Sequence, residues 1–279
     1  MVKIGLIADI QSADRGDKGR CLFRSSLDRL KQVVELFNAE GLDLVVQLGD
    51  VLDGNPQDEE GLAQSRSELD RVLEVLGELR CPLEHVVGNH CLALPRPELL
   101  RRLGLPRAQR ILEIQGRRIA LLDSLAVSLY DKNLDPQDLE EAHSALALGQ
   151  AAGEPWAVDW NGALGERQRE WLRRELLGPR RPDLFLCHHP IYPSAARARF
   201  LAWDHQEVLA LLGQNPAEPV TWISGHDHQG GRALDGANLH WTLPGLVAAT
   251  EVRGLERQDR DGFELFAPRL SSSTVSGHA

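Results

Sequence analysis

Gly225-His226-Asp227-His228 follows directly on the apolar run Val220-Thr221-Trp222-Ile223, and it places two histidines, one residue apart, after a strand-like segment. Four other apolar runs end in the same way. They are followed by Asp9-Ile10-Gln11, Gly49-Asp50, Gly88-Asn89-His90 and His188-His189. Five strand-like segments therefore deliver Asp, Gln, Asn and His side chains to one predicted edge of a sheet. These residue types bind metal ions, so the pattern predicts a metal site suited to hydrolysis.

The rest of the chain predicts an α/β fold in which strands alternate with helices. Short apolar runs predict strands at 2–8, 43–48, 83–87, 117–122, 183–187, 220–224, 238–243 and 262–266. Apolar stripes predict helices at about 24–39, 65–79, from 165 onward and 204–212. We expect a single domain over residues 1–270, with a cap insertion at 126–160 and a polar tail at 271–279 that frays.

The composition limits the partners and the compartment. The net charge of −10 argues against a nucleic-acid or anionic-membrane surface, whereas a small phosphorylated substrate stays compatible because metal ions supply local positive charge. The four cysteines form no CxxC pattern, and the N-terminus lacks the features of a signal peptide, so a cytoplasmic location is expected. No apolar run approaches the ~20 residues of a membrane span. The sequence leaves the oligomeric state open.

Seven side chains at the predicted edge are candidate metal ligands, too many for one ordinary site. They are the carboxylates of Asp9 and Asp50, the amides of Gln11 and Asn89, and the imidazoles of His188, His226 and His228. Such a set suits two divalent ions that share Asp50. Oxygen and nitrogen donors without a thiolate favour Mn²⁺, with Fe²⁺, Co²⁺ or Mg²⁺ as alternatives. Two ions ~3.5–4 Å apart can activate water and clamp a phosphoryl group.

The order and type of these motifs resemble the calcineurin-like metallophosphoesterase family across residues 9–228. That family usually has His where this chain has Gln11, and often has Glu where this chain has Cys91. The chain is similar to one branch, the manganese-dependent ADP-ribose/CDP-alcohol diphosphatases. The similarity rests on Gln11, Cys187-His188-His189-Pro190-Ile191-Tyr192-Pro193, Leu201-Ala202-Trp203, and Asn161-Gly162-Ala163-Leu164 followed by Gln168-x-x-Trp171-Leu172.

The resemblance implies a four-layer α/β-β/α sandwich, in which two central mixed sheets are flanked by helices. It also implies one metal held by Asp9, Gln11, Asp50 and His228, and a second held by Asp50, Asn89, His188 and His226. His90 is implied to face the leaving group. Asn161 is a candidate for substrate contact, as well as a turn residue before Gly162. Asp53 is either a turn former or support for a ligand.

These expectations lead to a two-metal phosphohydrolase. Its expected substrate is a nucleoside diphosphate linked to a sugar or alcohol, such as ADP-ribose, which gives two monophosphates. His90, if protonated, can protonate the leaving oxygen. A phosphodiesterase acting on cyclic nucleotides or other phosphodiesters needs the same metals and stays an alternative. The alternative from another class is a non-catalytic scaffold of this fold; its ligands would be degenerate, whereas every position here is a competent type.

Overall fold

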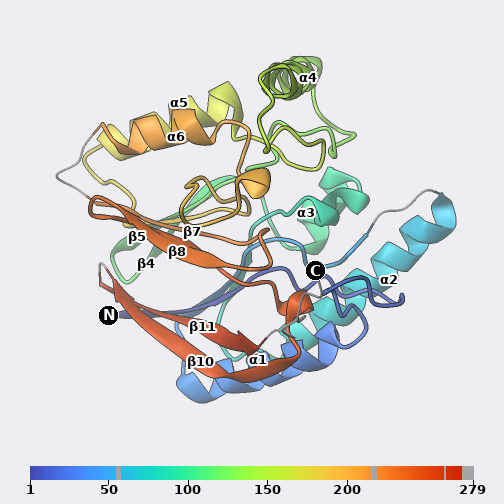
Figure 1. The fold of residues 1–279 in the computed structure, drawn as a ribbon. Coiled ribbons are helices and arrows are strands. Elements are labelled where there is room, and N and C mark those ends of the chain that lie inside the picture. The colour runs from blue at the N-terminus through green and yellow to red at the C-terminus, as the bar shows by residue number, and fades with distance from the viewer. Residues whose placement is uncertain (55–57, 215–218, 261, 272–279) are drawn as a thin grey trace, which may run out of the picture.

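The computed structural model describes residues 1–54, 58–214, 219–260 and 262–271, and its framework is two β-sheets packed face to face (Figure 1). The first sheet has the strand order β10-β11-β1-β2-β3. Its strands are β1 (Val2–Ile7), β2 (Leu44–Gln47), β3 (Leu83–His85), β10 (Glu251–Arg260) and β11 (Phe263–Ser271). β11, β1, β2 and β3 run parallel, and β10 joins β11 as an antiparallel edge.

The second sheet has the order β4-β5-β6-β7-β9-β8. Its strands are β4 (Arg110–Ile114), β5 (Arg117–Leu121), β6 (Leu184–Leu186), β7 (Thr221–Ser224), β8 (Gly231–Asp235) and β9 (Asn238–Thr242). The central strands β5, β6, β7 and β9 are parallel, while β4 and β8 pair antiparallel at the two edges. Both sheets are therefore mixed, as expected.

Helices cover the outer face of each sheet and complete four layers (Figure 1). α1 (Ser26–Glu40) and α2 (Glu59–Leu76) contribute to the core outside the first sheet. α5 (Gly165–Leu177) and α6 (His205–Leu212) do the same outside the second sheet. Between the sheets lies a third core, in which β1 and β2 face β6 and β7. Strands buried on both faces read as continuous apolar runs, which explains why the sequence predicts them. The predicted four-layer sandwich is confirmed.

The remaining elements lie between these layers. α3 (Arg96–Arg102) is short, and 3-10 turns span His90–Ala93, Ala198–Phe200 and Leu246–Ala248. α2 begins six residues earlier than predicted, because the Asp58 side chain accepts a hydrogen bond from the Gly61 amide at 2.9 Å and caps the helix. None of the helices in the described ranges is long and apolar enough to cross a membrane.

The predicted cap insertion at 126–160 contains α4 (Pro136–Ala151), which Figure 1 shows beside α5 and α6. A small apolar core that includes Val127, Ala142 and Trp203 holds this segment to the body of the protein. Coverage of the site by this segment stays a prediction. In the predicted tail, Ser271 still pairs with Glu251 at the end of β11, and residues 272–279 lie outside the described ranges.

Candidate metal centre

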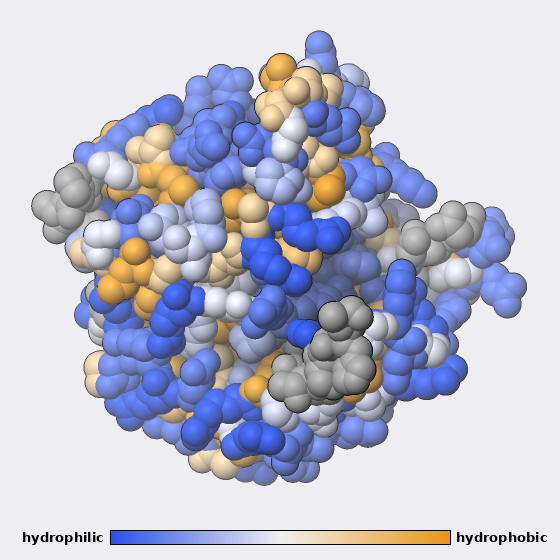
Figure 2. All heavy atoms as spheres, viewed as in Figure 1, coloured by the Kyte–Doolittle hydropathy of each residue, from blue (hydrophilic) through white to orange (hydrophobic). Residues whose placement is uncertain are grey.

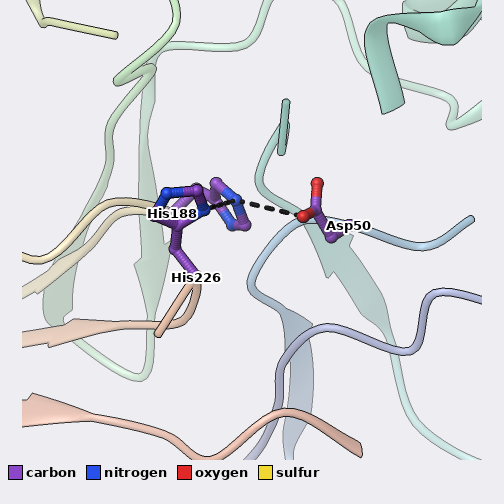
Figure 3. A group of neighbouring side chains, drawn as sticks. All are labelled: Asp50, His188 and His226. Atoms are coloured by element: carbon purple, nitrogen blue, oxygen red, sulfur yellow. Dashed lines mark hydrogen bonds and ion pairs between the residues drawn. The ribbon is translucent and has the colours of Figure 1, made fainter. Parts of the chain in front are cut away.

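The predicted donor side chains meet at the carboxyl ends of five parallel strands. In the first sheet, they follow β1, β2 and β3, and in the second sheet they follow β6 and β7. In open α/β sheets this edge is where ligands bind. Figure 3 shows Asp50 facing His188 and His226, and one donor atom from each of the three lies within 4.8 Å of the others. The structure thus brings together residues that are far apart in the sequence.

Four donor atoms converge around His188. Its Nε2 atom lies 3.1 Å from Asn89 Oδ1, 3.5 Å from Asp50 Oδ2 and 3.1 Å from His226 Nδ1. All four side chains are buried. Two ring nitrogens, an amide oxygen and a carboxylate oxygen that face one point form a donor set for a divalent cation.

The outward nitrogens of the two histidines are held by oxygen atoms. His188 Nδ1 lies 2.8 Å from the carbonyl oxygen of Leu48, and His226 Nε2 lies 2.9 Å from Asn161 Oδ1. Each oxygen favours a proton on the nitrogen that it contacts, so the opposite nitrogen keeps its lone pair for the shared point. Metal-binding histidines are usually oriented by such partners.

Asn161 uses its whole side-chain amide within the protein. Its Nδ2 donates to the carbonyl oxygens of Trp156 and Arg199, at 2.9 Å each, while its Oδ1 accepts from His226. The residue is fully buried. The expectation that Asn161 contacts substrate stays a prediction; in this structure, the amide ties two loops to a candidate ligand.

The second donor group lies around Asp9. His228 Nε2 is 3.7 Å from Asp9 Oδ1, and Gln11 Nε2 is 3.1 Å from Asp50 Oδ2. The amide nitrogen of Gln11 faces this carboxylate, and a half-turn of the amide would put Oε1 in its place. On the other side of the His228 ring, Nδ1 lies 3.7 Å from Cys21 Sγ.

Backbone strain is concentrated at this edge. Four of the five non-glycine residues with positive φ in the described ranges are predicted ligands: Asp9 (49°), Gln11 (41°), Asp50 (54°) and His226 (68°). Such conformations cost free energy and persist where the surrounding structure enforces them, often at functional sites.

Two glycines make room for the donors. A Cβ atom on Gly88 would lie 2.2 Å from Asp50 Oδ1, and one on Gly49 would lie 2.4 Å from His188 Nδ1. These contacts are too short for any side chain. Gly49 therefore leaves room for His188, and Gly88 leaves room for Asp50. Each glycine directly precedes another donor, Asp50 or Asn89.

The electrostatics of the site call for a cation. Burial raises the pKa of Asp9 to about 7. Burial also opposes ionisation of Asp50, but His188 and His90 hold the pKa of Asp50 well below its usual range. Burial acts to lower the pKa of His188, yet Asp50 raises it to about 9. Among the described residues, no Lys or Arg pairs with either aspartate, and buried carboxylates without such partners fit metal ligands.

His90 lies next to the donors but takes a different place. Its Nδ1 atom is 2.9 Å from Asp53 Oδ1, and about a third of its side chain is exposed (30%). Asp53 is buried and also forms an ion pair with Arg15, whose guanidinium lies 4.1 Å from the ring centre of Phe23. Asp53 thus lies beside His90, which is not a predicted ligand, and both alternatives for Asp53 stay predictions.

An aromatic and cationic patch adjoins His226. The ring centres of Trp160 and Phe200 lie 5.3 Å apart, and 5.3 and 5.5 Å from that of His226. Arg197 lies 4.4 Å from the Phe200 ring centre, and Arg199 lies 5.4 Å from both aromatic rings. On the face shown in Figure 2, hydrophilic side chains surround a hollow near the middle of the molecule.

The sequence alone does not predict this patch. Its residues lie on loops and on the 3-10 turn Ala198–Phe200, which have no periodic pattern, and only the fold brings 160 and 197–200 together. The one sequence feature that points to these residues is their place beside known motifs: Trp160 directly precedes Asn161, and Phe200 directly precedes Leu201-Ala202-Trp203.

Comparison with known proteins agrees with this geometry. A family model described as calcineurin-like phosphoesterase matches residues 2–230, which include all seven donors. A Danio rerio protein named manganese-dependent ADP-ribose/CDP-alcohol diphosphatase is 31% identical over 286 residues, covering 87% of each protein. A relative of the same name from Arabidopsis thaliana is 30% identical over 269 residues, covering 86% of this chain and 84% of the relative. A solved dimetal phosphatase from Danio rerio matches with a TM-score of 0.78 and 28% identity, over 88% of each chain.

Proposed function

Because this chain belongs to the calcineurin-like phosphoesterase family, we propose that it hydrolyses the diphosphate of nucleoside diphosphate-linked sugars or alcohols with the help of two metal ions. The observation that carries the proposal is the convergence of buried carboxylate, amide and imidazole donors beside a partly exposed His90 and an aromatic patch. Every donor position is filled by a competent residue type, which argues against a scaffold that has lost activity.

The donor geometry supports the following assignment of ligands. One metal is held by Asp9, Gln11, Asp50 and His228, and the other by Asp50, Asn89, His188 and His226. The relatives are named as manganese-dependent, and the oxygen and nitrogen donors fit Mn²⁺. When bound, two such ions supply an activated water and neutralise charge on the phosphoryl oxygens.

The protein's own residues supply positioning and proton transfer. Asp50 lies between the two donor groups, so its carboxylate can offset the charge of two cations. His90 Nδ1 lies 2.9 Å from Asp53 Oδ1, which leaves Nε2 for the oxygen that departs with the second phosphate. A proton donated there stabilises the leaving group.

The aromatic patch supports a nucleotide substrate. Base–aromatic stacking contributes ~1–3 kcal/mol, and arginine guanidinium groups also stack on such rings. Trp160 and Phe200 offer two rings beside the His226 end of the centre, with two arginines next to them. We propose that residues 126–160, which end at Trp160, form one wall of this substrate site.

Substrate hydrolysis by the purified, Mn²⁺-loaded protein tests the proposal. ADP-ribose should give AMP and ribose 5-phosphate, a CDP-alcohol should give CMP and the alcohol phosphate, and the chelator-treated protein should be inactive. Turnover of cyclic nucleotides without turnover of diphosphates would overturn the substrate assignment. Stable protein that binds Mn²⁺ but cleaves no phosphoester, including bis-p-nitrophenyl phosphate, would overturn the enzyme itself.

A further inference from the structure

A cavity of about 490 Å³ opens beside the metal centre, on the side of His228. It forms where the loop after β1, the loop after β7, residues 244–249 and the end of β11 meet. Its polar lining includes Arg20, Arg197, Gln229 and Ser271, together with the edge of His228. None of these cavity residues except His228 belongs to the proposed metal ligands.

The charge of this cavity is opposite to that of the whole protein. The chain carries 41 acidic and 31 basic residues, yet the described lining contains two arginines and no aspartate or glutamate. A larger cavity, of about 550 Å³, lies beside the turn that begins at His90. Its described lining contains Asp58, Glu59 and Asp131 with a single Lys132. An anion reaching the centre is therefore favoured on the His228 side.

The two arginines of the cavity differ in their partners. The guanidinium of Arg197 donates to both carboxylate oxygens of Asp227 and lies against the Phe200 ring, so its position is fixed and its charge is partly offset. Arg20, in contrast, has no hydrogen bond or ion pair with any other residue of the described ranges. Its side chain is exposed at the cavity, where its five N–H donors suit a phosphate group.

We propose that this cavity binds the phosphate of the substrate that is not held between the metals, and that Arg20 is its specificity-determining contact. The inference rests on the proposed function. In a diphosphate, one oxygen joins the two phosphorus atoms, so the second phosphate must lie close beside the centre. The cavity that shares His228 with the centre is the basic one. Arg20 thereby distinguishes a diphosphate from a lone phosphodiester.

Replacement of Arg20 separates the two kinds of substrate. Arg20→Ala should raise KM for ADP-ribose ~10-fold, the effect of losing one charged hydrogen bond, while kcat/KM for bis-p-nitrophenyl phosphate stays within about twofold. Arg20→Lys should recover part of the loss. Arg24→Ala is the matched control, because Arg24 lies on the same loop, is exposed and pairs with Asp14 outside the cavity. It should leave both substrates unchanged.

The failure of this inference can be distinguished from failure of the proposed function. If Arg20→Ala changes neither substrate, or both equally, the cavity does not select the second phosphate. If the wild-type protein does not cleave ADP-ribose, the proposed function fails, and inhibition of bis-p-nitrophenyl phosphate hydrolysis then tests the cavity. ADP should inhibit the wild type more strongly than AMP, and Arg20→Ala should abolish this difference. An unchanged ratio of the two inhibition constants would overturn the inference.

Discussion

The Oδ1 atom of Asn161 lies 2.9 Å from Nε2 of His226, and on the opposite side of the same ring Nδ1 lies 3.1 Å from His188 Nε2. One amide therefore decides which nitrogen of His226 faces the donor group around His188. The same amide donates to the carbonyl oxygens of Trp156 and Arg199, so the loops that carry the aromatic patch are tied to a proposed ligand. In the proposed function, Asn161 would therefore link the metal site to the loops that contact substrate.

Asn161→Ala should weaken the binding of the metal that is assigned to Asp50, Asn89, His188 and His226. Without Oδ1, the His226 ring loses the partner that orients it, and loss of such partners typically costs ~10–100-fold in metal affinity. Mn²⁺ titration of the metal-free variant measures the change. Asn38→Ala is the control, because Asn38 also makes two amide hydrogen bonds to backbone, to Glu78 and Arg80 on the surface. Wild-type affinity in Asn161→Ala would show that its amide does not support His226.

Asp50→Asn should remove nearly all activity and at least one metal. Its carboxylate lies between both donor groups, 3.1 Å from Gln11 Nε2 and 3.5 Å from His188 Nε2, and an amide cannot offset the charge of two cations. Metal analysis of the folded variant, checked by circular dichroism, measures the loss. Full occupancy by two metals would overturn the bridging assignment.

Gln11→Ala should release the metal that Asp9 and His228 also hold, and leave the other in place. A neutral amide oxygen is a weaker donor than imidazole, so Gln11→His should retain two metals and change the metal or substrate preference. Metal content and rates with Mn²⁺, Co²⁺ and Mg²⁺ measure both variants. If Gln11→Ala keeps the wild-type metal content and rate, Gln11 is not a ligand.

His90→Ala should keep both metals but lower kcat by ~10²–10⁴-fold, the range for a lost general acid. The loss should shrink for p-nitrophenyl esters, because a good leaving group needs less proton donation. An equal loss on good and poor leaving groups would show that His90 stabilises phosphoryl charge instead. Loss of metal would show that His90 is a ligand.

Asp53→Asn should produce a weaker form of the same defect. Asp53 Oδ1 lies 2.9 Å from His90 Nδ1, and an amide keeps the shape but removes the charge. We expect a kcat decrease of ~10-fold or more that also shrinks with a good leaving group. Arg15→Ala is the control, since it removes the other partner of Asp53 and leaves the contact with His90. A leaving-group dependence like that of the wild type would assign Asp53 a purely structural role.

The sequence predicts those parts of the fold that are buried on both sides. Parallel strands such as β1 and β7 appear as apolar runs because helices and the other sheet cover them. The missed strands β4, β8 and β10 are sheet edges, and β10 alternates between exposed and partly buried residues, many of them charged. Strands of that kind resemble polar loops in sequence.

The candidate site likewise has one part that the sequence predicts and one part that it does not. The donors could be predicted because each follows an apolar strand, and the ends of parallel strands meet at one edge. The contact of Asn161 with His226, or of Trp160 with Phe200, depends on how loops from different elements fold back. Such contacts leave no period in the sequence, and only the tertiary structure defines them.

Because the predicted donors come from both sheets, the site can be complete only when both sheets have formed. Asp9, Asp50 and Asn89 follow strands of the first sheet, whereas His188, His226 and His228 follow strands of the second, late in the chain. A nascent chain that has formed only β1, β2 and β3 therefore contains the carboxylate and amide donors but none of these three imidazoles. If these residues hold two metal ions, both metal sites can be complete only after residue 228 has been synthesised and the two sheets have docked. The complete metal centre is therefore expected to form late, after both sheets have folded.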